Sequence, residues 1–599
     1  MVKYKKRFSL FKMSSYELKF SFKNCPFLMI AEISACILHG LSFVVVIYMM
    51  QLFFDTIADA VNRRQSFKDV FTWALFLGIT VIFHQLINGI ENWLYDVLCD
   101  KLRGYAYLNL YRKSSKIKAE NFESPEFLDE LSKAKEGAEH FELPLFPIIG
   151  LSTFYLSYFL GVGGYIYSVY PLLAISIVMV FIPSFLGQYI KSFLYSKLAD
   201  EVTPYRRKYE YYEECICGKE YYKETRLLSA VGFFTRLYKE SLELLTVKAW
   251  ATSKKDAMIV AFVRTISLLG YLGILIMFVN ALFKGDISVG VFVAVYTSIG
   301  KMFSMMDEVV DTLSSLMQNV GLTQNYMSFL ETQEEEKKDI NVSVSNEIEL
   351  KNVTFRYLSA EKDTLEDINL IINAGETVAI VGENGSGKST LVKLISGLFA
   401  PTSGQVIYDG ISIDKVKRKN VYSNLSIVCQ NFMKYKISLR NNVVISKDFY
   451  EYEEENKAND SKIQKLLEKV SINLQQKEFD NGIDTILARE FDGVDLSGGQ
   501  WQRISIARGI HRPHSLIILD EPTAAIDPVE ETNLFNMFAK LSKDKTSIIV
   551  THRMGCAKIA DKIIVMGKGK IVEMGSHEEL LKKSGMYCAM YKSQSQWYQ

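Results

Sequence analysis

Long apolar segments in the N-terminal half of the chain are the feature that most restricts its fold. A helix of about 20 apolar residues crosses the hydrocarbon core of a bilayer, and backbone groups there must be hydrogen-bonded within the segment. The alternative, a large soluble helical core, is disfavoured because the segments are long and carry few charges. Residues 1–330 are therefore predicted to form an all-α transmembrane domain of six helices, at about 27–54, 70–94, 145–166, 172–190, 258–283 and 287–306.

The connections between these segments alternate in length and charge. Those after the second and fourth segments are long and basic, which places them in the cytosol together with the N-terminus. Each holds a candidate short helix, at 122–131 and 218–228, and Ser124 and Pro125 suit the N-cap and first position of the former. Either these helices dock on the following domain and transmit its motion to the membrane, or they are plain solvated loops; composition favours neither.

Several polar side chains interrupt the apolar segments. Ionisable groups inside a membrane usually face a cavity or one another, which makes these residues candidates for a substrate path. Near the segment ends, snorkelling to the interface or hydrogen bonding between helices explains them equally well. The residues are Glu32, His39, His84, Gln85, Asn88, Glu91 and Arg264.

Composition changes after residue 330. An acidic and polar stretch, 331–346, is predicted to be a linker, and residues 347–599 have the composition of a soluble α/β domain. The net charge of +1 gives no indication of a nucleic-acid partner. The basic N-terminus lacks the short apolar core and cleavage site of a secretory signal, so no cleaved signal is expected.

A glycine-rich loop follows a short β-branched run at 377–381, and a helical apolar pattern follows the loop. Strand, glycine loop and helix in this order are the context of a P-loop, whose backbone N–H groups and helix N-terminus bind phosphate. Lys388 is placed to reach the β- and γ-phosphate oxygens of ATP, and the Ser389 hydroxyl to ligate Mg²⁺. The predicted nucleotide-binding residues here are Gly382, Glu383, Asn384, Gly385, Ser386, Gly387, Lys388, Ser389 and Thr390.

A second apolar run, SLIIL at 515–519, ends in two acidic residues. The run predicts a buried strand, so Asp520 would hold Mg²⁺ directly or through water. Glu521 would then polarise the water that attacks the γ-phosphate.

The pentapeptide LSGGQ, residues 496–500, is a third phosphate-binding motif. Its glycines allow close backbone approach, and Ser497 with the N–H groups of the following helix can bind a γ-phosphate. No strand–loop context precedes that helix, so another molecule must present the phosphate. The chain is therefore expected to dimerise around nucleotide through Ser497, Gly498, Gly499 and Gln500.

With these motifs, residues 347–599 resemble the nucleotide-binding domain of ABC transporters, and the six-span half resembles the membrane domain of ABC exporters. The resemblance implies an α/β P-loop ATPase domain with a helical subdomain, which hydrolyses ATP with Mg²⁺. It implies that Tyr357 stacks on adenine, that Gln430 contacts Mg²⁺ and senses the γ-phosphate, and that Asp527 lies in the loop crossing the dimer interface. His552 is implied to hold the γ-phosphate and the attacking water.

Two details refine the resemblance. Glu521, His552 and the LSGGQ motif are intact, so a homodimer would have two competent ATP sites. A heterodimer with a different chain is the alternative. Residues 489–493, REFDG, depart from the common Gly-Glu-x-Gly form of the family.

The loop helices EFLDELSKA and KEYYKETRL, with LSGGQWQR, are similar to those of bacterial peptide and lantibiotic exporters. The implied function is ATP-driven export of a bacteriocin- or lantibiotic-like peptide across the bacterial cytoplasmic membrane. The ATPase domain would lie in the cytosol, and another protein would remove any leader of the cargo. A lipid or glycolipid flippase, a multidrug exporter and a non-transporting ATP-binding membrane sensor are the alternatives.

Overall fold

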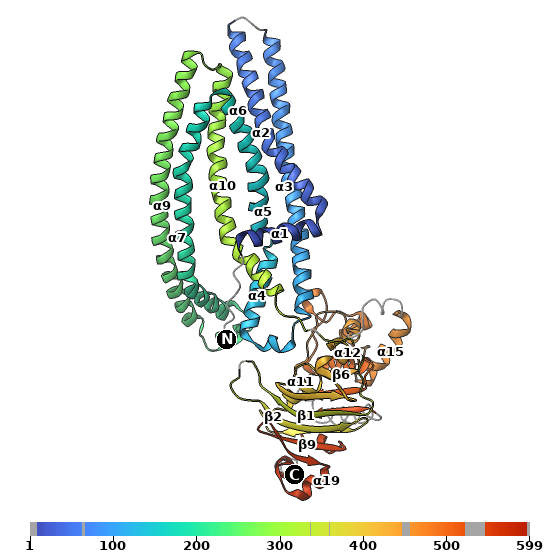
Figure 1. Cartoon of the computed structure of the whole chain (residues 1–599). Coiled ribbons are helices and arrows are strands. Elements are labelled where there is room, and N and C mark those ends of the chain that lie inside the picture. Colours follow the sequence, from blue (N-terminus) through green and yellow to red (C-terminus); the bar gives the residue numbers. More distant parts are fainter. Residues whose placement is uncertain are drawn as a thin grey trace. The chain divides into compact units, whose positions relative to one another are not determined.

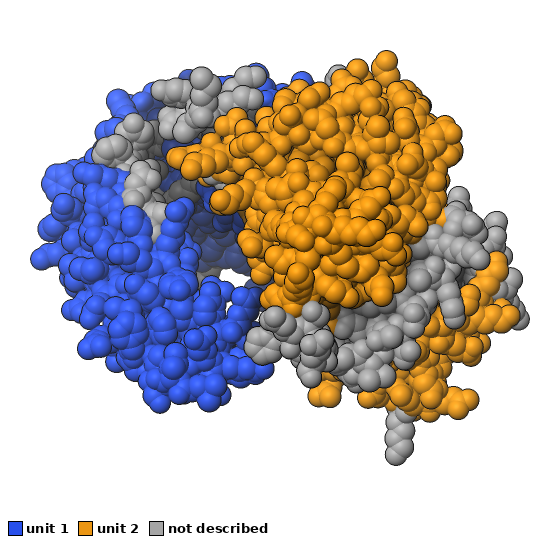
Figure 2. Space-filling model, turned by 90° about the horizontal axis from the view of Figure 1, so that it is seen from below, with its two compact units in different colours: residues 1–115, 129–332 blue, residues 116–128, 333–599 orange. Residues whose placement is uncertain are grey.

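The computed structural model describes residues 9–62, 66–335, 337–358, 360–445, 456–521 and 545–595. The chain divides into two compact units, coloured separately in Figure 2. Unit 1 comprises residues 1–115 and 129–332, and unit 2 comprises residues 116–128 and 333–599. Residues 116–128, in the middle of the first long connection, therefore group with the C-terminal unit, although they lie between two apolar segments in the sequence.

Unit 1 is helical throughout its described residues, with long helices side by side (Figure 1). Helix α2 packs along α3, and α7 packs along α9. The apolar segments predicted from the sequence fall inside helices, except that the sixth begins two residues before α10. The helices are α1 (Leu10–Asn24), α2 (Pro26–Val61), α3 (Phe67–Ser114), α4 (Pro125–Glu139, which begins in unit 2), α5 (Glu142–Gly150), the π-helical turn η2 (Leu151–Tyr155), α6 (Leu156–Val169), α7 (Pro171–Cys217), α8 (Tyr222–Leu227), α9 (Val231–Lys284) and α10 (Val289–Leu330).

Five helical stretches in the described chain are long and apolar enough to cross a membrane: α2, α3, the continuous run from α5 to α6, α9 and α10. The fourth expected segment lies in α7, whose apolar stretch, Pro171–Pro183, is shorter. The apolar part of α3 buries none of its residues within the chain. Such a surface is stable only against lipid or a second protein surface, which agrees with a membrane-embedded unit.

Unit 2 contains two β-sheets (Figure 1). The smaller is antiparallel, with strand order β2-β1-β4-β5. The larger has the order β10-β9-β3-β8-β7-β6 and is parallel except for β10. The strands are β1 (Glu347–Phe355), β2 (Leu365–Asn373), β3 (Thr377–Gly382), β4 (Ser403–Tyr408), β5 (Ile411–Ser412), β6 (Leu425–Val428), β7 (Leu516–Asp520), β8 (Thr546–Val550), β9 (Lys562–Gly567) and β10 (Lys570–Gly575).

Helices and both sheets enclose two main apolar cores in unit 2. One core joins the two sheets with α11, and the other joins α13, α15 and α16 to the edge of the larger sheet, forming a helical subdomain. Because parallel strands end at the same edge of a sheet, β3, β6, β7 and β8 bring the residues that follow them together. The helices are α11 (Lys388–Ile395), α12 (Arg418–Ser423), α13 (Leu439–Val444), α15 (Asn456–Lys469), α16 (Gly498–His511), α18 (Met554–Ala557), α19 (His577–Lys583) and α20 (Met586–Ser595).

The segment before β1 is fixed to unit 2 rather than free. Asp409, in the turn between β4 and β5, accepts hydrogen bonds from the backbone N–H groups of Ser345, Asn346 and Glu347 at 2.8, 2.9 and 3.0 Å. Earlier in the segment, Glu335 pairs with Arg418 at 3.4 Å. The sequence predicts a polar linker here, and the structure shows that its C-terminal part lies against the sheets of unit 2.

Candidate ATP site

The predicted P-loop surrounds a cavity of about 700 Å³ at the carboxyl ends of the parallel strands. The loop turns from β3 into α11 through Gly385 and Gly387, whose φ angles of 79° and 101° are left-handed. A Cβ atom on Gly387 would come within 2.6 Å of a Leu365 methyl, so the close packing of loop on strand requires glycine. Predicted residues from separate parts of the chain line the cavity: Gly382, Glu383, Asn384, Gly385, Gly387, Lys388, Ser389, Thr390, Gln430, Glu521 and His552.

Lys388 is held at the base of this cavity. Its side chain is only 6% exposed, and its ammonium donates to the carbonyl oxygens of Gly382 at 2.9 Å and Glu383 at 3.0 Å. Burial lowers the pKa of Lys388, while the charges of Glu521 and Asp520 oppose that shift. A positive charge fixed at the start of α11, whose dipole adds to it, forms an anion site of the kind that binds phosphate.

The strand ends bring two polar side chains, Gln430 and His552, against Glu521. Gln430, after β6, donates from Nε2 to Oε2 of Glu521 at 2.6 Å. His552, after β8, places Nδ1 3.4 Å from Oε1 of Glu521. Glu521 has a left-handed φ of 46°, and its N–H is anchored on the Val550 carbonyl at 3.0 Å. The carboxylate is thus held between an amide and an imidazole at the mouth of the cavity.

The donor set fits a magnesium ion. Burial, and secondarily the charge of Glu521, raises the pKa of Asp520 to about 6. Its Oδ1 atom and the Ser386 hydroxyl are buried without a hydrogen-bond partner among the described residues. Buried polar atoms of this kind are costly unless a ligand completes them, and hard oxygen donors are those that Mg²⁺ prefers. Together with Ser389 and Gln430, Asp520 supplies such donors.

Tyr357 lies beside the P-loop helix. Its hydroxyl is 3.1 Å from Oγ1 of Thr390, and its ring lies 5.7 Å from the Lys393 ammonium. It is packed against the core of the two sheets. Its predicted contact with adenine remains a prediction. Asp527 lies outside the described residues.

The signature residues lie at the start of α16 and do not line this cavity in the described part of the chain. The Ser497 hydroxyl caps the helix by accepting a hydrogen bond from the Gln500 N–H at 3.2 Å. The Oε1 atom of Gln500 accepts a hydrogen bond from the Ser497 N–H at 2.8 Å. Cβ atoms added at Gly498 and Gly499 would meet nothing within 4 Å. This capped helix end is open to an incoming group, as the sequence predicts for a phosphate carried by another molecule. The divergent segment 489–493 lies just before it, and Lys436 pairs with Glu490 there.

A second cavity, of about 500 Å³, lies within unit 1. The polar residues predicted inside the apolar segments gather around it, except Arg264, which is not among the lining residues. Further polar lining residues were not predicted from the sequence, among them Cys36, Asn92, Lys301 and Glu308. The spacing of Glu32, Cys36 and His39 at i, i+4 and i+7 is the signal that places Cys36 on their helix face. The predicted residues found here are Glu32, His39, His84, Gln85, Asn88 and Glu91.

Comparison with known proteins identifies the family of the chain. The family model described as ABC transporter matches residues 365–524. The chain is 30% identical over 596 residues to the subtilin transport ATP-binding protein SpaT of Bacillus subtilis, covering 97% of this chain and 94% of that protein. The chain belongs to the ABC transporter family.

The chain is also similar to a second relative and to a solved structure. An ATP-dependent lipid A-core flippase of Wigglesworthia glossinidia brevipalpis is 30% identical over 357 residues, which is 58% of each chain. The solved structure of a bacterial Atm1-family ABC exporter with ATP bound matches with a TM-score of 0.75 at 19% identity, over 95% of this chain and all of that one. The fold is therefore that of an ABC exporter, with a helical membrane unit and an ATP-binding unit on one chain.

Proposed function

We propose that this ABC exporter uses ATP hydrolysis to move a peptide of the bacteriocin or lantibiotic kind out of a bacterial cell. It would work as a dimer in the cytoplasmic membrane, with its ATPase units in the cytosol. The observation that carries the proposal is the position of Glu521, held between Gln430 and His552 at the mouth of the P-loop cavity.

In the proposed reaction, Glu521 is the general base. Its carboxylate takes a proton from water as the water oxygen attacks the γ-phosphorus, and the bond to the bridging oxygen of ADP breaks. Lys388 stabilises the β- and γ-phosphate oxygens, while His552 and Gln430 hold Glu521 and the water in place. Mg²⁺, held by Ser389, Gln430 and Asp520, would neutralise charge on the phosphates.

The signature supports a second copy of the chain as the partner. In the described part of the chain its residues do not line the P-loop cavity, and Cβ atoms added at Gly498 and Gly499 would meet nothing within 4 Å. A second chain would bring its own γ-phosphate to this helix end and close two equivalent sites. Closure favoured by ATP supplies the two states that alternating access requires.

Peptide cargo is proposed because the subtilin transporter aligns over nearly the whole chain, including the membrane unit. A lipid flippase is the second candidate, because the lipid A-core flippase has the same identity over about half of each chain.

ATP-dependent uptake into inverted membrane vesicles tests the proposal, comparing wild type with Glu521→Gln. Vesicles would be offered a pool of small peptides and a labelled lipid. Peptide uptake in wild type only is the expected result, and the variant should still bind ATP. Lipid movement without peptide uptake would replace the peptide proposal with the flippase. ATPase activity with movement of neither would overturn transport.

A further inference from the structure

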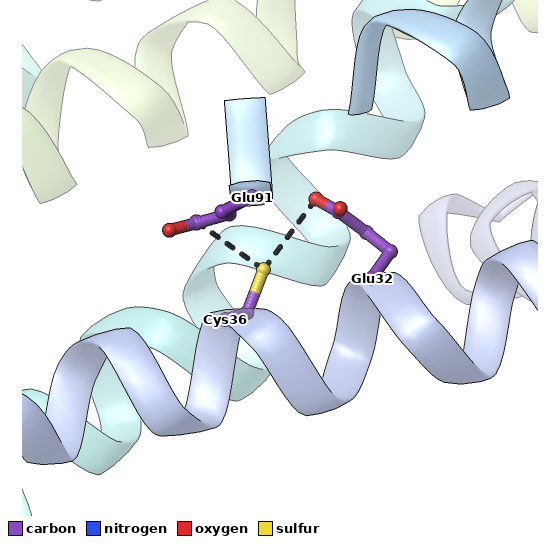
Figure 3. Close-up of side chains that lie close together, drawn as sticks. All are labelled: Glu32, Cys36 and Glu91. Atoms are coloured by element: carbon purple, nitrogen blue, oxygen red, sulfur yellow. Dashed lines mark hydrogen bonds between the residues drawn. The ribbon is translucent and has the colours of Figure 1, made fainter. Parts of the chain in front are cut away.

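Three potential metal ligands meet between α2 and α3 in unit 1 (Figure 3). Glu32 and Cys36 lie one turn apart on α2, and Glu91 reaches them from α3. The Sγ atom of Cys36 is 3.5 Å from Oε1 of Glu32 and 3.4 Å from Oε1 of Glu91. The ligand atoms of the three residues all lie within 4.8 Å of one another. The arrangement places one sulfur and two carboxylate oxygens around a common space between the two helices.

These distances are those of a zinc-type site. With metal–oxygen and metal–sulfur bonds of about 2.1 and 2.3 Å at a tetrahedral angle, sulfur and oxygen ligands lie about 3.6 Å apart. The two sulfur–oxygen separations of 3.4 and 3.5 Å are close to that value, and the two carboxylate oxygens lie within 4.8 Å of each other. Mixed thiolate and carboxylate donors favour a borderline-soft divalent ion over Mg²⁺ or Ca²⁺.

Burial supplies an independent reason to expect a ligand. Glu32 and Cys36 are each only 2% exposed, and Oε2 of Glu32 is buried without a hydrogen-bond partner among the described residues. An unpartnered carboxylate oxygen is costly in a membrane interior. Among the described residues, three glutamates, one lysine (Lys301) and two histidines line the surrounding cavity. A bound divalent cation would give Oε2 of Glu32 a partner and offset the negative charge of the glutamates.

His39 adds support from the next turn of α2. Its Nδ1 atom contacts Oε2 of Glu91, the oxygen that does not face Cys36. A histidine in this place fixes the orientation of a liganding carboxylate, as partners of metal ligands commonly do. The ring is itself packed against Phe43 and Phe154. His39 is thus a positioning residue for Glu91.

We propose that Glu32, Cys36 and Glu91 bind a divalent transition-metal ion of the zinc type, with His39 holding Glu91. Cys36 binds as the thiolate, so one proton leaves the thiol when the ion enters. Three protein ligands leave a fourth position, which opens on the cavity of about 500 Å³. Water or a donor atom of the cargo would occupy it. The proposal of this site does not depend on the proposed ATPase reaction.

Cobalt titration of the full-length, tag-free protein in detergent tests this site. The protein is first stripped with a chelator, and Co²⁺ is then added while absorption is recorded. A thiolate ligand gives a sulfur-to-cobalt charge-transfer band, which no carboxylate or imidazole site produces. We expect one Co²⁺ per chain with this band, and its displacement by Zn²⁺.

Variants connect the band to the cluster. Cys36→Ser should abolish the band, and Glu91→Gln should weaken Co²⁺ binding at least tenfold. His39→Asn should weaken binding roughly 10- to 100-fold while the band persists at saturation, as expected of a residue that orients a ligand. Cys99→Ser, buried in α3, and Cys429→Ser, beside the ATP site, are the controls and should leave the titration unchanged.

Two results would overturn the metal site. One is a wild-type titration without a charge-transfer band at one equivalent of Co²⁺. The other is a band that survives Cys36→Ser or disappears with Cys429→Ser. Each variant must elute in detergent as wild type does and unfold at the wild-type temperature, so a lost band cannot be assigned to a misfolded membrane unit.

Discussion

Lys388 carries the residue-scale argument for nucleotide binding. Its ammonium already donates to two loop carbonyls, so exchanging these for phosphate oxygens requires little movement. Hydrogen bonds to a charged group contribute about 1.5–3 kcal/mol, so Lys388→Met should weaken ATP binding roughly 10- to 150-fold. Calorimetric titration with ATP measures this. Lys417→Met, which removes an exposed lysine paired with Asp339, is the control and should bind as wild type. Unchanged affinity in Lys388→Met would contradict the assignment.

Sequence motifs predicted the residues of the ATP cavity because each motif is local and has a fixed place on a strand end. The P-loop lies between Gly382 and Ser389, and the strand that precedes Glu521 ends at Asp520. The motifs do not give the contacts between them. That Gln430 donates to Glu521 depends on the order β7–β6 in the sheet. The cavity-lining residues Met590 and Gln594 of α20 belong to no motif and were not predicted.

At the scale of elements, composition did not decide whether the first long connection docks on the following domain or is a solvated loop. The contacts of residues 116–128 bear on this question. It belongs to unit 2, where Ala119 packs against the core of the sheets. Glu123 pairs with Lys393 at 2.9 Å, and the Glu120 carboxylate accepts from the Ala400 N–H. The connection is therefore a docked element rather than a solvated loop.

Charge reversal in this element should separate hydrolysis from transport. Glu123→Lys places its ammonium group beside that of Lys393 and should reduce transport per ATP severalfold. The ATPase activity should stay within about twofold of wild type, because an exposed ion pair contributes only about 0–1 kcal/mol to stability. Glu130→Lys, an exposed reversal further along α4, is the matched control. Vesicle uptake and phosphate release, measured on the same preparation, give the ratio. Equal loss of both activities would count against a coupling role.

The turn between β4 and β5 supports a stability prediction. Burial raises the pKa of Asp409, but the three backbone N–H donors outweigh burial and hold the pKa below its usual range. Asp409→Asn keeps the left-handed backbone but loses the charge, which should cost about 1 kcal/mol and lower the unfolding temperature of unit 2 by about 2–4 °C.

The sign of the pH dependence follows from the lowered pKa. Stabilisation by Asp409 is fully present above the unfolded pKa, near 3.9, and is lost as pH falls through the folded value. Thermal unfolding of wild type and Asp409→Asn, followed by intrinsic fluorescence at pH 7 and pH 3, should show a difference that shrinks in acid. A difference that is constant with pH would exclude the carboxylate as its source.

Other elements lie beyond local sequence patterns. Helix α1 packs through Glu17, whose carboxylate accepts from the hydroxyl of Thr323, 306 residues later in the chain. The π-helical turn at Leu151–Tyr155 interrupts the third apolar segment without a glycine or proline inside it. The apolar pattern predicts helix through the third segment, whereas no helix was predicted at residues 10–24. Tertiary packing determines the partner of α1 and the irregular turn.

At the scale of the whole molecule, the separation of P-loop and signature predicts sites shared between two chains. Lys388→Met disables the P-loop of its own chain. Gly498→Glu disables the signature, and it should leave the fold intact because an added Cβ meets nothing within 4 Å. A heterodimer of these two variants keeps one intact site if the sites are shared, and none if each site lies within one chain.

Tandem affinity purification of differently tagged, co-expressed chains isolates this heterodimer for ATPase measurement. Each variant alone should be inactive. The Lys388→Met/Gly498→Glu heterodimer should have about half the wild-type activity if its sites act independently. A wild-type/Lys388→Met heterodimer also keeps one intact site, so it shows what one site can sustain. The contradicting result is ATPase activity in the wild-type/Lys388→Met control but none in the double-variant heterodimer. It would mean that each signature acts on the ATP bound to its own chain, and that hydrolysis does not need a site shared between two chains.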